Sequence, residues 1–141
     1  MKTCRIVSLL MLIFAAVSVI PTGFLISGEK QVVVEGILVD SKCYAQDNKN
    51  TTNDHDTPAG TMTNCGTACA AMGIPVGVLE GGKEGGDVYV LLVPSRTLAD
   101  HVGKWARVTG KNVFSGSLMV DKLEVKDKSG NFRNVEIITM M

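Results

Sequence analysis

The 141-residue sequence has few aromatic residues: one Trp, two Tyr and four Phe, together 5% of the chain. It also has no excess of either charge, because 14 Lys and Arg balance 14 Asp and Glu. Proteins that bind nucleic acid usually combine a basic surface with aromatic side chains on which the bases stack. Here Tyr44, Tyr89 and Trp105 are scattered along a chain without net charge. We therefore expect no nucleic-acid partner.

Several sequence motifs of known chemistry are also missing. The chain has no P-loop, no dinucleotide-binding fingerprint, no G-x-S-x-G and no H-E-x-x-H. It has no C-x-x-C-H, which excludes covalent attachment of c-type haem. A hydrophobic content of 45% excludes a disordered chain. We therefore name no catalytic residue and expect one small globular domain that binds a ligand rather than an enzyme.

Residues 1–28 have the pattern of a secretion signal. Lys2 and Arg5 precede an apolar run from Ile6 to Ile20, which continues weakly to Ile26. The pattern predicts an exported protein, periplasmic or extracellular, whose mature domain is 29–141. The alternative is that 1–28 stays as a membrane anchor, and the protein then contacts the membrane through this segment alone. Cleavage would leave 12 basic and 14 acidic residues, a net charge of −2.

The rest of the chain has the alternation of an all-β protein with one or two short helices. Runs rich in β-branched residues are separated by turns rich in Gly, Asn and Asp. The predicted strands are Gln31–Val39, Val76–Leu79, Val88–Val93, Trp105–Phe114, Leu118–Val125 and Phe132–Ile138. Short helices are predicted over Cys65–Met72, with Asn64 as the N-cap, and over Ser95–His101.

This order of elements predicts an OB-like small Greek-key β-barrel. In that fold a helix joins the third and fourth strands, and the loop after the first strand often contacts the ligand. Gly36 and Gly110 are expected where long strands must bend to close the barrel. A small open β-sandwich is the alternative. In both, the polar stretch 40–64 is expected to be a long loop, within an insertion at about 40–73.

The insertion holds the residues with metal-binding chemistry. It contains all three cysteines of the mature chain and His55. Cys65 and Cys69 are four residues apart, so on a helix they share a face and can reach one metal ion. We predict a metal site formed by Cys43, His55, Cys65 and Cys69. Three sulfurs and one nitrogen suit zinc, whereas a thioether from Met62 would suit copper(I).

Two other interpretations of these cysteines stay open. A disulfide from Cys43 to Cys65 or Cys69 is expected in an exported protein, and it would give a structural or adaptor domain that recognises a protein partner. The C-x-x-x-C pair formed by Cys65 and Cys69 would alternatively serve thiol redox exchange, because the helix N-terminus stabilises a thiolate at Cys65.

Short motifs in this region resemble those of a group of small exported bacterial proteins of uncharacterised function. They are D-S-K-C-Y at 40–44, D-H-D-T-P at 54–58, N-C-G-T-A-C at 64–69 and G-I-P-V-G-V-L at 73–79. The group shares D-x-x-C-Y, a loop with His, C-x-x-x-C and G-x-P. The resemblance extends from Glu35 to about Val125. It implies an OB-like fold and a single constellation of the three Cys and the His, and it assigns no activity.

Overall fold

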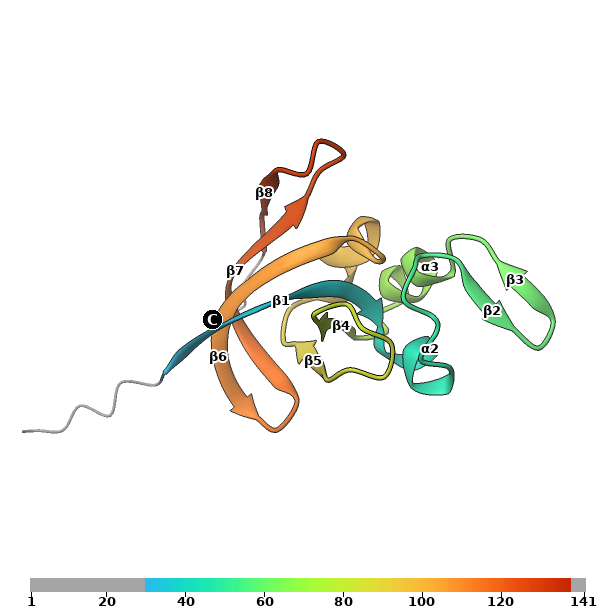
Figure 1. Ribbon diagram of the computed structural model, residues 1–141, viewed down its shortest axis with the longest axis horizontal. Helices are drawn as coiled ribbons and strands as arrows, with labels where there is room; N and C mark the ends of the chain where they lie inside the picture. Colours follow the sequence, from blue (N-terminus) through green and yellow to red (C-terminus); the bar gives the residue numbers. More distant parts are fainter. Residues whose placement is uncertain (1–29, 138–141) are drawn as a thin grey trace, which may run out of the picture.

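The computed structural model describes residues 30–137, and their main element is one six-stranded sheet (Figure 1). The order of the strands across the sheet is β5-β4-β1-β6-β7-β8. The strands are β1 (Gln31–Asp40), β4 (Val76–Glu80), β5 (Val88–Leu91), β6 (Trp105–Phe114), β7 (Ser117–Lys126) and β8 (Phe132–Val135). The prediction of a mainly β chain with short helices is confirmed. The predicted export segment, 1–28, lies outside the described residues.

Five of the six strands pair in a closed ring. All neighbours in the strand order are antiparallel. In addition, β5 pairs with β7 in parallel, with Val90 opposite Ser117 and Leu91 opposite Leu118. Hydrogen bonding therefore runs through β5, β4, β1, β6 and β7 and back to β5, while β8 extends the sheet from β7.

The core fills the inside of this ring. Side chains on β1, β6 and β7 alternate between buried and accessible positions, as a strand periodicity of two requires, whereas β4 is buried at four consecutive residues. Fully buried aliphatic residues include Leu38, Val78, Leu98, Val108 and Leu123. Each such side chain contributes roughly 1.5–3 kcal/mol to folding by leaving water. The sheet thus has a large apolar core, to which the insertion contributes only Ala70.

The two glycines predicted at strand bends lie where backbones approach closely. A Cβ at Gly36 would collide with the carbonyl oxygen of Leu79 on β4, and a Cβ at Gly110 with that of Met119 on β7. The β6–β7 ladder changes register between Thr109 and Gly110. A bulge of this kind bends and twists the strand.

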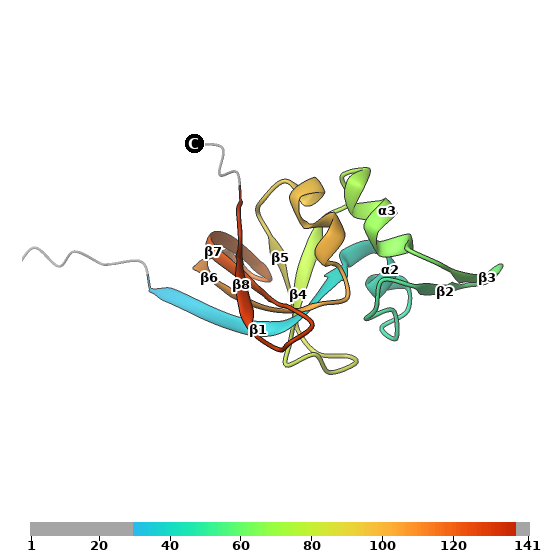
Figure 2. The ribbon, with the colours of Figure 1, turned by 90° about the horizontal axis from the view of Figure 1, so that it is seen from above.

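The insertion between β1 and β4 is more ordered than the sequence predicted. It forms α2 (Ser41–Gln46), a hairpin of β2 (His55–Thr57) and β3 (Gly60–Met62), and α3 (Cys65–Ala71). These elements project together from one end of the sheet (Figures 1 and 2). The expectation of a structureless loop over 40–64 is therefore wrong. Capping explains α2, because the Asp40 side chain accepts hydrogen bonds from the backbone N–H groups of Lys42 and Cys43.

The short helix α3 begins as predicted but is not capped as predicted. Asn64 occupies the N-cap position with a φ of 56°, and its side chain makes no capping hydrogen bond. The Asn64 side-chain oxygen instead accepts from Nδ2 of Asn53 at 2.9 Å. On its other side, α3 packs against the 3₁₀ helix η1 (Ser95–His101). Within residues 30–137, no helix has both the length and the apolar character that a bilayer crossing requires.

Candidate metal centre

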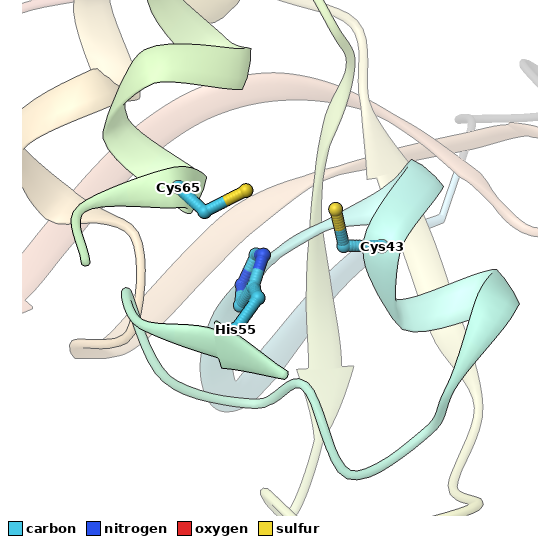
Figure 3. A group of neighbouring side chains, drawn as sticks. All are labelled: Cys43, His55 and Cys65. Carbon is cyan, nitrogen blue, oxygen red and sulfur yellow. The ribbon is translucent and has the colours of Figure 1, made fainter. Parts of the chain in front are cut away.

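Each side chain of the predicted metal site is buried in the insertion. Cys43 lies in α2, His55 begins β2, Cys65 begins α3 and Cys69 follows one helical turn later. His55 is completely buried, and each of the three cysteines is 8% exposed. Figure 3 shows the side chains of Cys43, His55 and Cys65 close together. They come from three separate elements, α2, β2 and α3. Residues far apart in the sequence therefore meet in one place.

The predicted ligands form two overlapping groups. One ligand atom each from Cys43, His55 and Cys65 lie within 4.8 Å of one another. A second group within the same distance consists of Cys43, Cys69 and Asp40. The structure thus brings Cys69 to the cluster through Cys43 and Asp40 rather than beside Cys65. Asp40 is a member that the sequence analysis missed.

Only one of the two ring nitrogens of His55 has a hydrogen-bond partner. Nε2 lies 2.8 Å from the carbonyl oxygen of Thr52 and must donate to it, because a carbonyl only accepts. Nδ1 is buried and has no hydrogen-bond partner. An imidazole held by a backbone carbonyl on one side, with a free lone pair on the other, is the usual arrangement of a metal-binding histidine.

The two carboxylate oxygens of Asp40 also differ in their partners. Oδ1 accepts from the backbone N–H groups of Lys42 at 2.9 Å and Cys43 at 3.2 Å. Oδ2 is buried without any hydrogen-bond partner, although the residue is only 1% exposed. The sequence signal was an acid three residues before Cys43 in D-S-K-C. The pattern does not by itself indicate a cap, because the capping role of Asp40 depends on the helix that follows it.

Burial keeps two of the thiols protonated in the metal-free protein. Loss of solvation, with the Asp40 carboxylate and the Cys65 thiol as further causes, raises the pKa of Cys43 to about 11. Burial, followed by the nearby Asp40 carboxylate, raises the pKa of Cys69 to about 12. A redox-active thiol requires the opposite shift. Only a positive charge brought into the cluster would stabilise these two thiolates.

Two asparagines from the connecting segment hold the elements of the cluster in place. Asn50 is 5% exposed and donates to the carbonyl oxygen of Cys43, while its side-chain oxygen accepts from the backbone N–H of Asp56. The side-chain oxygen of Asn53 accepts from the backbone N–H of Thr67 at 2.8 Å. Asn50 thus links α2 to β2, and Asn53 links the same segment to α3.

Cys43, Cys65 and Cys69 all carry free thiols, so residues 30–137 contain no disulfide. The disulfide alternative is therefore not realised in the described structure. Met62 pairs with His55 across the β2–β3 ladder, but its side chain is half exposed, unlike the buried cluster. This exposure weakens the case for a thioether ligand and hence for copper(I).

A cavity of about 470 Å³ borders the cluster at Cys43. Its other lining residues come from α2 and from the β2–β3 hairpin with the turn that follows β2, and they are Gln46, Asp47, Asp56, Thr57 and Pro58. Two of these are acids, which favour a cation over an anion. The cavity places open space next to Cys43.

No protein-family profile, no curated protein and no solved structure matches this chain. The functional argument therefore starts from the cluster itself.

Proposed function

We propose that this protein is an exported metal-binding domain that holds zinc at Cys43, His55 and Cys65, with Cys69 adjacent. The observation that carries the proposal is the unpartnered Nδ1 of the buried His55, in a group with two thiols. A buried polar atom without a partner costs about 1–3 kcal/mol, and a metal ion would remove that cost.

The ligand types favour zinc among the biological metals. Zinc takes Cys sulfur at about 2.3 Å and His nitrogen at about 2.0–2.1 Å in a tetrahedral arrangement, so its ligand atoms lie about 3.5–4 Å apart. The group formed by Cys43, His55 and Cys65 lies within 4.8 Å and needs only a small contraction to reach that geometry. Copper(I) remains the second candidate metal, because thiolates also bind it well.

A bound metal would take the place of a hydrophobic core in the insertion. The buried apolar cluster there consists of Cys43, Cys65 and Cys69 with Ile74 against them, whereas the core of the sheet is far larger. Small segments of this kind gain folding free energy directly from the metal. The role we propose is therefore binding, with no catalytic residue assigned.

Two further parts of the proposal concern the fold and the location. We infer an OB-like barrel from the closed ring, from its parallel β5–β7 pairing and from η1 between β5 and β6. Export is inferred from residues 1–28 and from the resemblance to small exported bacterial proteins.

Elemental analysis of the protein, exported and purified without a metal-affinity tag, tests this function. We expect at least one zinc per chain, with thiols that react only after chelation and denaturation. Cys65→Ser should lose zinc, whereas His101→Ala should keep it, because His101 lies in η1 and belongs to neither group. Metal-free protein with freely reactive thiols would overturn the proposal.

A further inference from the structure

The two groups of the cluster share a single side chain, Cys43. His55 and Cys65 complete one group, and Asp40 and Cys69 complete the other. A thiolate sulfur has three lone pairs, so it can bind two metal ions at once. The shared position of Cys43 is thus the position that a bridging ligand between two ions would occupy.

Asp40 provides an independent reason for a second ion. The capping of α2 uses Oδ1 alone, and an asparagine or serine would cap as well. The chain instead has a carboxylate whose Oδ2 is buried and unpartnered, beside two thiols. A buried carboxylate oxygen with neither a cation nor a hydrogen-bond donor beside it is unfavourable, even though Oδ1 of the same group has two donors. Its presence is explained if a cation occupies the Asp40 side of Cys43.

The total charge of the ligands also favours two bound ions. Three thiolates and one carboxylate carry four negative charges, and the imidazole of His55 is neutral. One divalent ion would balance two thiolates and leave the Asp40 carboxylate buried without a cation, beside a third cysteine that stays a neutral thiol. Two divalent ions would neutralise the set, as burial demands.

We propose that the cluster binds two zinc ions bridged by the Cys43 sulfur, one held with His55 and Cys65 and the other with Asp40 and Cys69. This inference rests on the proposed function and adds to it a second ion and a role for Asp40. Each ion has three protein ligands, so one position on each is left for water or a small anion. The cavity at Cys43 brings solvent to the bridge.

Metal counting by native mass spectrometry on the zinc-loaded full chain tests the second ion. We expect two zinc ions per chain for the unmodified protein and one for Asp40→Asn. This variant keeps a side-chain oxygen to cap α2 and replaces only the free carboxylate oxygen with an amide. Asp47→Asn is the matched control, since Asp47 lines the cavity but belongs to neither group, and it should keep two ions.

The possible counts separate the two proposals. No bound zinc overturns the proposed function and the second ion together. One zinc in both the unmodified protein and Asp40→Asn overturns the second ion and leaves the proposed function intact. Two zinc ions in Asp40→Asn would show that Asp40 is not a ligand and would overturn this arrangement.

Cobalt(II) substitution tests the bridge and does not depend on how Asp40→Asn folds. Two cobalt ions that share one sulfur couple magnetically, so their electron paramagnetic resonance signal falls below that of two isolated ions. We expect this loss in the fully loaded protein and full signal when one equivalent is bound to Cys69→Ala. Two uncoupled cobalt ions in the unmodified protein would overturn the bridging role of Cys43.

Discussion

His55 and Thr52 are joined by a hydrogen bond of 2.8 Å from the ring Nε2 to the backbone carbonyl oxygen. The bond fixes the tautomer of the ring, because a proton on Nε2 leaves Nδ1 as the basic nitrogen. It also fixes the ring orientation before any metal arrives. The histidine would therefore lose little conformational freedom on binding an ion.

Replacing this histidine should weaken metal binding sharply. His55→Ala removes the only nitrogen ligand of the group, and we expect the zinc dissociation constant to rise by at least about 100-fold, beyond the effect of losing an outer partner. Competition with a chromogenic chelator measures the constant. The control is His101→Ala, the other histidine of the chain. Equal affinities of the two variants would contradict a ligand role for His55.

Two thiols of the metal-free protein, those of Cys43 and Cys69, should be unreactive. With a pKa of about 11 for Cys43 and about 12 for Cys69, against an ordinary 9.0, the thiolate fraction at pH 8 falls about 100-fold or more. Alkylation by iodoacetamide, followed by peptide mapping, should therefore be slow until the protein is unfolded. The rate should increase with pH throughout the range from 7 to 10. Rapid alkylation at pH 7 would instead favour the thiol-redox interpretation.

Metal removal should unfold the insertion and spare the sheet. The buried cluster of the three cysteines is small, while β1, β6 and β7 surround a far larger core to which the insertion contributes only Ala70. In the presence of a strong zinc chelator, hydrogen exchange should become fast across 41–73. The amides of β6 and β7 should stay protected. Simultaneous loss of protection in both regions would show that the metal stabilises the whole domain.

Gly36→Ala should destabilise the sheet. The added methyl group would meet the backbone carbonyl of Leu79, which cannot move without disturbing the β1–β4 ladder. We expect a loss of about 1–3 kcal/mol or more in the free energy of unfolding. The comparison is Val33→Ala on the same strand, which is 60% exposed and should change stability by about 0.5 kcal/mol or less. Urea denaturation measures both.

An ion pair between β1 and β6 should make the free energy of unfolding depend on pH in the acid range. Arg107 donates to Glu35 at 2.6 Å and thereby lowers the pKa of that carboxyl. A pKa lowered by folding stabilises the protein above the unfolded-state pKa, and this stabilisation is lost as the pH falls through the folded-state value. Glu35→Gln should therefore have a lower melting temperature than the unmodified protein at pH 7. In acid the two melting temperatures should be the same. Glu84→Gln, in an exposed loop, should melt with the unmodified protein at both pH values.

The strands were predictable because their signal is local. Alternating β-branched residues and Gly-rich turns predicted strands at all six sheet positions within a few residues. The helix α2 was not predictable in this way, because S-K-C-Y-A-Q has no apolar periodicity. It forms because Asp40 caps it and because Cys43 is buried. Local sequence patterns therefore do not predict such a helix.

The candidate site was predictable in composition but not in arrangement. Cys43, His55, Cys65 and Cys69 stood out because they share one insertion. The division into two groups depends on how α2 and α3 pack, which no spacing along the chain records. Asp40 joins them only because β1 ends beside α2. Sequence spacing predicts that Cys65 and Cys69 can reach one ion, and the fold adds that Cys69 also lies in a group with Cys43 and Asp40.

The insertion departs from and returns to the sheet at paired residues, since Asp40 of β1 lies opposite Val76 of β4. Neighbouring strands are about 4.8 Å apart, a gap that a two-residue turn closes. The segment between these residues thus occupies the position of a hairpin turn. A simple turn in its place would join β1 to β4 but would remove the packing of α3 against η1 and Ala70 from the core.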